Sequence, residues 1–462
     1  MLELSVLCIV NTNKSDKRNE VYPMKRLICL WLLLGCLAGY GQDKWTIDRC
    51  VQYAVTHNHD VRLQSIALHD CKIEKESKVG AFLPSVGGNI GGQFNFGRAI
   101  DPETNTYTNV STFYNSYGVS VGIPLFDGLQ RYNDLRAAKA DVLMGRSRLE
   151  AQKDETARKV LESCVQLLYY QGCIDIAVRK RSESEQLLRQ TKVMVEVGQK
   201  GEADVAQMQA TFASDDYEVT RQQSLYDNAL LALKQLMNYP IDEPLEIAPY
   251  DEVNPDVDVA SPEELYRLGR LENPDIKQAE FNLKSATYAY RSSKGALFPA
   301  ISLGAGVSTT YYKQLDVPGK TSFSDQFRNN AGEYVYATLS IPLFNRLQTL
   351  GNIRRRRNNV KRAKEELAYR DSELRRLIQE TVTDLQNSRK ETEKMRLKVA
   401  SDSIATRLTV RKYEEGLASS VDVQTQSVTL LQSRAQLLQC RLNCMYKTRM
   451  MNYYQGKPLW TE

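Results

Sequence analysis

Residues that carry enzyme or metal chemistry are scarce in this 462-residue chain. It has three histidines, His57, His59 and His69, whose spacing does not bring three imidazoles to one point on a helix. It has no phosphate-binding glycine loop and no C-x-x-C zinc pair. The G-x-S-x-G sequence at 118–122 would need a strand-to-helix turn at Ser120 and a histidine base, yet no histidine follows residue 69. We therefore expect no enzyme, no metal and no cofactor.

An apolar run long enough to span a membrane as a helix is also missing near the N-terminus. The apolar stretch Leu27–Leu37 is about half of the ~20 residues that a spanning helix needs. It follows a basic pair just after Met24, which predicts a secretory signal peptide that starts at Met24 and is cleaved before Gln42. Lipidation of Cys36, within a sequence similar to a bacterial lipoprotein box, is the alternative. Residues 1–41 are expected to be absent from the mature, exported protein.

Neither charge nor cysteine points to a special partner or compartment chemistry. The formal net charge is +5, which does not call for nucleic acid as a partner. Six cysteines follow residue 41, and most lie in helical patterns: Cys50, Cys71, Cys164, Cys173, Cys440 and Cys444. We interpret them as small buried apolar residues, with disulfides or metal binding as the alternative.

The chain repeats itself once over almost its whole length. Asn58 matches Asn273 at an offset of 215 residues, and the Ile-Pro-Leu-Phe segment at 123–126 matches 341–344 at an offset of 218. A repeat of this length is a duplicated half-domain rather than a solenoid unit. The expected first repeat is 42–260, with strands at about 83–96 and 113–126, a helical hairpin at about 128–238 and a linker at 239–260. The expected second repeat is 261–462, with strands at about 298–312 and 333–344, a helical hairpin at about 346–453 and a C-terminal tail.

Four segments alternate with a period of two, as strands with one apolar face do. In the first of them, Val86, Ile90 and Phe94 share a face opposite glycines and small polar residues. Strands of ~11 residues tilted near 45° cross ~25 Å, the height of an outer-membrane apolar band. Four strands cannot close a barrel, and open edges are not tolerated in lipid, so three copies would share a twelve-stranded transmembrane barrel with a water-filled lumen. One sheet of a soluble β-sandwich is the alternative.

Two proline-free segments predict unusually long helices. Each of 127–197 and 345–415 would span ~105 Å as a helix, and apolar residues step by seven from Leu135, which is typical of a packed seam. After Gly198 and Gly416 the chain turns back as a second long helix. The fold class is therefore mostly α with a β-barrel part. The basic run Arg354–Arg357 at the start of one long helix is interpreted as a solvated face or a ring near the lumen mouth rather than a nucleic-acid patch.

The duplication, the strand starts LPS and FPA, the IPLF strand ends, and the turns VGQKGEADV and YEEGLASSVDV together carry a family resemblance. Over essentially the whole mature chain, the sequence resembles the TolC family of trimeric outer-membrane efflux proteins. This resemblance implies a homotrimer in the outer-membrane lipid, whose barrel continues as an α-helical tunnel across the periplasm. It also implies a passive channel of a tripartite system that exports small molecules, with a periplasmic adaptor protein and an inner-membrane pump of the resistance-nodulation-division type as partners.

The resemblance also implies roles for residues at the helical turns. Gly198 and Gly416 would form the periplasmic tips and, with Asp204 and Asp422, contact the adaptor. Asp422 would lie at the tunnel constriction, where three-fold symmetry makes a ring of three carboxylates that attracts cations. Thr425 occupies the place of a second acid that some members carry. For Asp204 and Asp422, helix N-capping after the turn is the alternative role.

Two other functions share most of these features. An exit duct for type I protein secretion has the same architecture and differs in its pump. A soluble periplasmic coiled-coil scaffold would keep the long helices and use the strands as a small sandwich. The sequence does not identify the cargo.

Overall fold

The computed structural model describes residues 44–100, 105–109, 111–249, 261–315 and 322–460. It divides the chain into two compact units, residues 1–45 and 46–462. Every described helix and main strand lies in the second unit. The predicted signal peptide, Met24 as its start, and Cys36 all lie outside the described residues.

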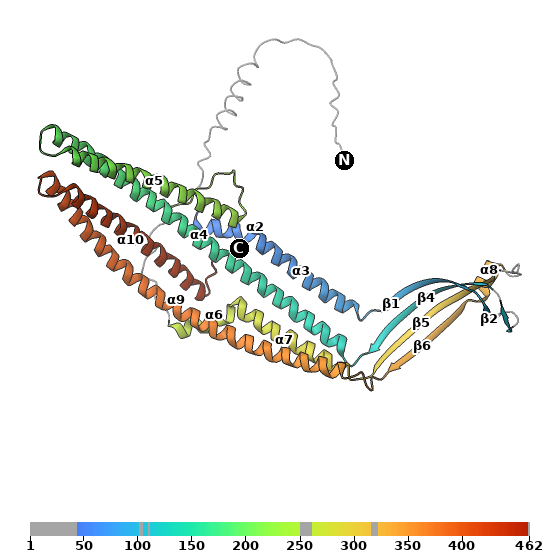
Figure 1. Cartoon of the computed structure of the whole chain (residues 1–462). Helices are drawn as coiled ribbons and strands as arrows, with labels where there is room; N and C mark the ends of the chain where they lie inside the picture. Colours follow the sequence, from blue (N-terminus) through green and yellow to red (C-terminus); the bar gives the residue numbers. More distant parts are fainter. Residues whose placement is uncertain (1–43, 101–104, 110, 250–260, 316–321, 461–462) are drawn as a thin grey trace, which may run out of the picture. The chain divides into compact units, whose positions relative to one another are not determined.

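The second unit is built from two copies of one pattern (Figure 1). The first copy contains α2 (Ile47–His57), α3 (His59–Gly80), β1 (Ser85–Asn95), β2 (Arg98–Ile100), β3 (Tyr107–Asn109), β4 (Thr112–Phe126), α4 (Gln130–Glu196) and α5 (Glu202–Met237). The second contains α6 (Pro262–Glu272), α7 (Pro274–Gly295), β5 (Ala300–Gln314), α8 (Phe323–Asn329), β6 (Gly332–Ser340), α9 (Gln348–Glu414) and α10 (Ser420–Tyr454). Each copy is thus two helices, two main strands, a long helix and a returning helix.

The two helices before each strand pair are absent from the predicted organisation, which has only strands and one hairpin per repeat. In both copies, an asparagine caps the second of these helices. Asn58 Oδ1 accepts hydrogen bonds from the backbone N–H groups of residues 60 and 61 at 2.8 and 3.3 Å, and Asn273 Oδ1 accepts the equivalent pair, both at 3.0 Å. The repeated asparagine that reveals the duplication is therefore a helix N-cap. An asparagine followed two residues later by an acid, as in 58–60 and 273–275, is the local signal for such a cap.

The four main strands form one antiparallel sheet in the order β1-β4-β5-β6. The central pair holds Val121 opposite Ala305, with a β-bulge between Pro124 and Phe126, so β4 continues through the first Ile-Pro-Leu-Phe segment. In the second copy, the predicted strand at 333–344 is too long, because β6 ends at Ser340. Pro342 has no N–H group to donate, and β6 is an edge strand without a neighbour on its far side to hold a bulged continuation.

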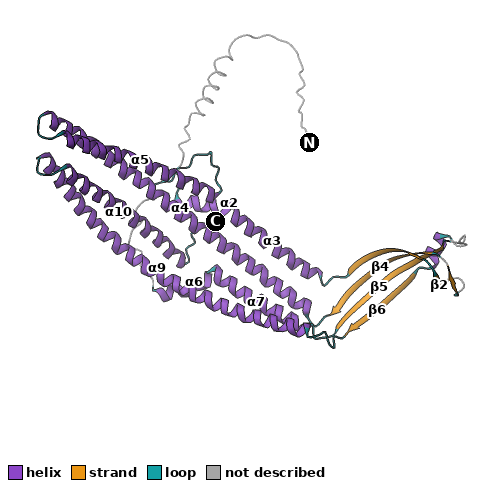
Figure 2. Ribbon diagram, viewed as in Figure 1, coloured by secondary structure: helices purple, strands orange, loops and turns teal. Residues whose placement is uncertain are grey.

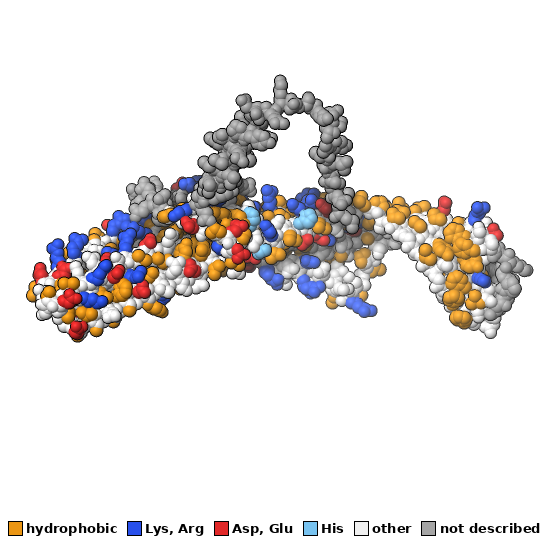
Figure 3. Space-filling model, turned by 90° about the horizontal axis from the view of Figure 1, so that it is seen from above, with side chains coloured by type: hydrophobic (Ala, Val, Ile, Leu, Met, Phe, Trp, Pro, Cys, Tyr) orange, Lys and Arg blue, Asp and Glu red, His pale blue; other side chains and the backbone are white. Residues whose placement is uncertain are grey.

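The surface of this sheet is nearly free of charge. Among the residues of the four main strands, only Lys313 and Glu333 are charged, and both lie at the loop end of their strands. Both edge strands are exposed over almost all of their residues. Figure 3 shows apolar and uncharged side chains over the sheet, whereas blue and red side chains are dense on the helical part. Within the described ranges, no second sheet packs on this one, so the β-sandwich alternative has no partner layer.

Each strand pair is joined by a loop with structure of its own. Strands β2 and β3 form a short hairpin between β1 and β4, and α8 lies between β5 and β6. The Gln326 side chain accepts from the backbone N–H of Tyr312 and donates to its carbonyl, both at 2.9 Å. Strand β6 pairs with β5 only as far as Ser308. Beyond that residue, the two bonds of Gln326 satisfy backbone groups of β5 that no strand pairs on that side. The α8 loop therefore covers the part of β5 that β6 leaves open.

The helices form a layer that continues the order of the sheet. Contacts join α3 to α4, α4 to α7, and α7 to α9, while α5 packs on α4 and α10 on α9 (Figures 1 and 2). Helices α4 and α9 have 67 residues each, so each is ~100 Å long. No helix among the described residues is long and apolar enough to cross a membrane.

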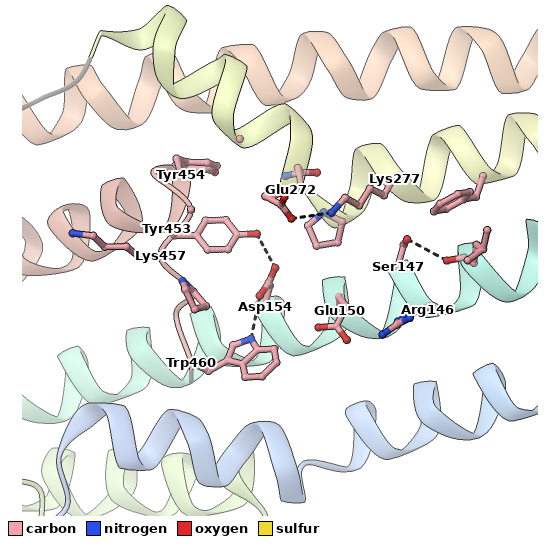
Figure 4. Close-up of a pocket in the computed structure, with 17 residues that line it drawn as sticks. Arg146, Ser147, Glu150, Asp154, Glu272, Lys277, Tyr453, Tyr454, Lys457 and Trp460 are labelled. Atoms are coloured by element: carbon pink, nitrogen blue, oxygen red, sulfur yellow. Dashed lines mark hydrogen bonds and ion pairs between the residues drawn. The ribbon is translucent and has the colours of Figure 1, made fainter. Parts of the chain in front are cut away.

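Near the middle of the helices, the C-terminal segment closes over α4 (Figure 4). Asp154 accepts hydrogen bonds from the Tyr453 hydroxyl at 2.7 Å and from Trp460 Nε1 at 3.2 Å. Lys153 Nζ lies 4.7 Å from the centre of the Trp460 ring. Burial raises the pKa of Asp154 above its ordinary value, and the two donors act against that shift. These contacts fix residues 455–460 beside a cavity of about 480 Å³.

Candidate gating and docking site

The two helical turns have the same backbone design. Helix α4 ends before Gly198 (φ +75°) and α9 before Gly416 (φ +79°). At each turn the glycine N–H and the following N–H return to carbonyls of the last helical turn, at 2.7 to 3.0 Å. This is a Schellman-type ending, which favours glycine because the left-handed conformation strains any residue with a Cβ. Both predicted turn glycines therefore lie where the chain reverses.

The helices that return from the two turns start differently. Helix α10 has a capping box, in which Asp422 Oδ2 accepts from the Ser419 backbone N–H at 2.9 Å and from its hydroxyl at 2.7 Å. These hydrogen bonds lower the pKa of Asp422 below its ordinary value. Helix α5 has Gly201 at the N-cap and no side-chain cap. The capping role considered for the two acids is thus present for Asp422, which stays exposed, while Asp204 is half-buried and makes no such cap.

Thr425 is exposed one turn further along α10. Its hydroxyl donates to the Val421 carbonyl at 2.9 Å, so its hydrogen is used within its own helix. Asp422 is therefore the only carboxylate in the described first two turns of α10, and Thr425 adds no charge beside it.

Three contacts between the hairpins, which the sequence did not predict, tie the two turns together. The Tyr413 side chain is fully buried, and its hydroxyl lies 3.0 Å from Thr191 Oγ1. Lys200, from the first turn, places its Nζ 4.2 Å from the centre of the Tyr413 ring. A little further from the turns, Gln207 donates to Gln424 at 2.7 Å. No local sequence signal identifies these pairs, because their members are more than 200 residues apart.

Between the hairpins, close to these ties, lies a groove of about 440 Å³. Its lining mixes buried apolar residues, such as Met208 and Val423, with charged ones. Lys180 Nζ lies 3.5 Å from Asp215, and both side chains are largely shielded from solvent. Most of the residues that line the groove are polar or charged, and some of them, such as Ser184 and Thr211, are buried. No group of three metal-ligating residues is arranged to hold an ion within the described ranges.

An antiparallel sheet of nearly uncharged strands, continued by two helices of ~100 Å, is the architecture expected of an outer-membrane channel protein. The model of the outer membrane efflux protein family matches residues 74–239 and 265–445, one segment in each repeat. The chain belongs to this family. It is an outer-membrane efflux protein, and the proteins it resembles are channels rather than enzymes.

Individual relatives are distant in sequence. The outer membrane efflux protein BepC of Brucella suis is 22% identical over 334 residues, which cover 72% of this chain and 69% of BepC. The pyoverdine export outer membrane protein OpmQ of Pseudomonas aeruginosa is 29% identical over 214 residues, or 45% of this chain and 40% of OpmQ. The crystal structure of the Campylobacter jejuni CmeC outer membrane channel superposes with a TM-score of 0.75 at 15% identity, covering 90% of this chain and 87% of CmeC.

Proposed function

We propose that three copies of this chain form a passive conduit, the outer-membrane component of a tripartite efflux system. The observation that carries the proposal is that the sheet and the helix layer each end in open edges, with no further strand or helix beside them among the described residues. The sheet ends at β1 and β6, and the helix layer ends at α3 and α9, in the same order. Open sheet edges in lipid leave backbone groups unsatisfied, at a cost of several kcal/mol each. Further copies of the chain supply the missing partners when β6 of one copy pairs with β1 of the next.

The duplication predicts the register of that pairing. In the observed β4–β5 pair, Val121 faces Ala305. The repeat offsets of 218 and 215 residues convert these positions to Leu339 on β6 and Ile90 on β1. Both side chains are strongly exposed in the single chain, at 59% and 79%. Three copies joined in this register give twelve strands, enough for a barrel with a water-filled lumen.

Cysteine cross-linking tests this arrangement. The Ile90→Cys/Leu339→Cys variant, treated with a mild oxidant in membranes, should give a covalently linked trimer on denaturing gels. The matched control is Ile90→Cys/Thr338→Cys, because residues one position apart on a strand point to opposite faces. The two single variants control for the native cysteines. Dimers and trimers that form equally in the control pair, or no linked species in the first pair, would contradict the proposed register.

The cargo we propose is small molecules, including drugs and toxic compounds. This rests on the family and on relatives such as OpmQ, whose name assigns it to pyoverdine export. Energy would come from an inner-membrane pump, with resistance-nodulation-division pumps as the type we favour, and a periplasmic adaptor protein would connect the two. The groove between the hairpins and the turns at Gly198 and Gly416 are the surfaces we propose for the adaptor.

The gate in this proposal lies at the turns. Three copies of Asp422 around the axis would make a carboxylate ring that attracts cations, and Asp204 would lie nearer the adaptor surface. Opening would separate the two hairpins of each copy, which requires breaking the contacts of Tyr413 with Thr191 and Lys200. Adaptor binding in the adjacent groove is the event we propose to favour that separation.

Two alternatives remain distinguishable by experiment. A type I secretion duct would share the trimer and would restore export of a protein substrate, rather than drug resistance, in a strain without its own outer-membrane channel. A soluble periplasmic scaffold would leave the membrane fraction in high salt without detergent. The uncharged strands favour the membrane protein, which should need detergent for extraction.

A further inference from the structure

The ends of α7 and α9 nearest the sheet carry a large excess of positive charge. Residues 281–297 and 345–364 contain eleven Lys and Arg and no acid. We call these eleven the basic collar: Lys284, Arg291, Lys294, Arg346, Arg354, Arg355, Arg356, Arg357, Lys361, Arg362 and Lys364. The equivalent parts of the first repeat, 66–82 and 127–146, contain seven Lys and Arg but also six acids. Since the two halves share one fold, the fold alone does not require this charge.

The central part of the basic collar has no partner among the described residues of its own chain. All four side chains of Arg354–Arg357 are exposed. None of them takes part in an ion pair or hydrogen bond with another described residue, whereas Arg131 near the start of α4 pairs with Asp127 at 2.7 Å. The first-repeat equivalents of Arg355 and Arg356 are Ala137 and Ala138, which are buried. The second repeat thus has two guanidinium groups in solvent where the first has two buried methyl groups.

The collar lies directly beside the membrane-facing part of the protein. Strand β6 ends at Ser340, and the connection to α9 exposes Leu343 at 92% and Phe344 at 79% (Figure 1). Arg355 comes seven residues after α9 begins at Gln348, which is ~10 Å along the helix. A headgroup layer is about 5 to 8 Å thick on each side of the hydrocarbon, and fixed charges act over ~8 to 10 Å in physiological salt. The arginines are therefore within reach of lipid phosphates.

A ring inside the lumen does not account for all of these residues. Successive helical residues are 100° apart, so Arg354–Arg357 point in four directions that together cover most of the helix circumference. Helix α7 occupies one side of α9. Arg136, the first-repeat equivalent of Arg354, donates a hydrogen bond to the Tyr288 hydroxyl of α7 at 3.3 Å. In the proposed trimer, α3 of the next copy lies beside α9 as α7 lies beside α4, so Arg354 should point to that α3. Of the two sides that remain, one faces the interior and the other the exterior surface beneath the membrane.

We propose that the basic collar binds the anionic phosphate headgroups of phospholipids in the leaflet that borders the helices, such as phosphatidylglycerol. Clusters of four to eight Lys and Arg immediately beyond a membrane-spanning segment are a signature of anionic-lipid binding. Leu343 and Phe344 supply apolar contact with the acyl region next to them. This inference rests on the proposed function, because it needs the strands to lie in a membrane.

The test compares lipid binding by the detergent-extracted full-length protein and two triple variants. In the collar variant, Arg355, Arg356 and Arg357 are changed to Gln, and Arg354 is kept for the contact with the next copy. The control variant makes the same charge change further along α9, where Lys390, Lys394 and Arg396 are also exposed, ~50 Å from the collar. Native mass spectrometry then counts bound phosphatidylglycerol against phosphatidylcholine added at equal concentration, with and without inorganic phosphate at a similar concentration.

Wild type and the control variant should bind phosphatidylglycerol about tenfold more tightly than phosphatidylcholine, and the collar variant should lose most of that preference. Competition by inorganic phosphate at similar concentration would show a free-phosphate site and would overturn the lipid assignment. Equal binding of both lipids by wild type, or an unchanged preference in the collar variant, would also overturn it. A wild type that leaves membranes without detergent would refute the proposed function itself, whereas a detergent-dependent trimer without lipid preference would refute only this inference.

Discussion

If the proposed gate is correct, removal of one buried hydroxyl should loosen its closed state. The Tyr413 hydroxyl lies 3.0 Å from Thr191 Oγ1, and the Thr191 hydroxyl also donates to the Leu187 carbonyl at 2.9 Å. Because a threonine has a single hydroxyl hydrogen, Tyr413 must be the donor to Thr191. Tyr413→Phe removes this bond and leaves every donor satisfied. The loss is that of an ordinary buried hydrogen bond, about 1 kcal/mol in each copy.

The size of the effect depends on how the three copies open. About 1 kcal/mol changes an equilibrium about fivefold, so a single hairpin should open about five times more often. If all three copies open together, about 3 kcal/mol is lost and the change is about 150-fold. Single-channel recording in planar bilayers measures the open fraction, and cells that carry the variant should admit bulky antibiotics that the closed wild type excludes.

Two further variants show whether the effect comes from this bond. Thr191→Val removes the acceptor with little change in shape, so the double variant Tyr413→Phe/Thr191→Val should open no more than either single variant. Tyr446→Phe removes a hydroxyl that donates to Glu162 at 2.8 Å, near the other end of α10, and should leave the open fraction unchanged. An open fraction in Tyr413→Phe equal to that of wild type would refute the assignment of this contact to the gate.

Five further substitutions test the proposed carboxylate ring, the C-terminal segment and the turn. Asp422→Ala should raise conductance and weaken block by divalent cations, and Asp422→Asn, which keeps an acceptor for the helix cap, should weaken the block without destabilising α10. Because hydrogen bonds from Ser419 lower the pKa of Asp422, the wild-type block should persist as the pH falls from neutral and be lost only below the ordinary pKa of an aspartate. Trp460→Phe removes a donor to Asp154 and should expose residues 455–460 to faster amide hydrogen exchange, by about fivefold for a bond worth about 1 kcal/mol. Gly416→Ala forces a residue with a Cβ into the left-handed region, so it should lower the free energy of unfolding by about 1 kcal/mol in denaturant titration. The control Gly351→Ala lies inside α9 with open space around it, so it should raise the free energy of unfolding by up to about 1 kcal/mol. Unchanged block in Asp422→Asn, unchanged exchange in Trp460→Phe, or equal effects of the two alanines would each contradict the corresponding role.

The features that the sequence predicts well are those set by periodicity and by backbone chemistry. Alternation of apolar and small residues locates all four main strands, and the absence of proline over long stretches predicts the two 67-residue helices. Gly198 and Gly416 are predicted as turns for the same kind of reason, since only glycine adopts their positive φ without strain. These signals are local, so a single sequence contains them.

The parts that the sequence did not predict depend on tertiary contacts or on edges. The repeat predicts a strand at 333–344 that matches β4, but β6 ends at Ser340. Strand β4 continues through Pro124 because β5 pairs with it across a bulge, and β6 has no strand that pairs with it in this way among the described residues. The sequence around Tyr413 does not distinguish it from other tyrosines, because the contact that makes it a candidate is with Thr191, 222 residues away. The family resemblance named Asp422, with helix capping as its alternative role, and the structure adds that its partner in the cap is Ser419.

The two halves of the molecule share one fold but differ in their charged and capping residues. The hairpins have long helices of 67 residues each, return helices of 36 and 35 residues, and the same glycine turn, so the differences between them lie mainly in their side chains. The first hairpin begins its return helix at Gly201 without a side-chain cap, while the second begins at Ser419 with a capping box that holds an exposed carboxylate. At the opposite end, the second half has the basic collar where the first half has paired charges and buried alanines. The second repeat therefore carries an exposed acid at its turn and unpaired bases beside the sheet. If both features serve the conduit, a chain with Arg355→Ala, Arg356→Ala and Asp422→Asn should keep the fold and the trimer but lose much of the divalent block and of the lipid preference together. A variant that retains both would show that these charges are incidental to the second repeat.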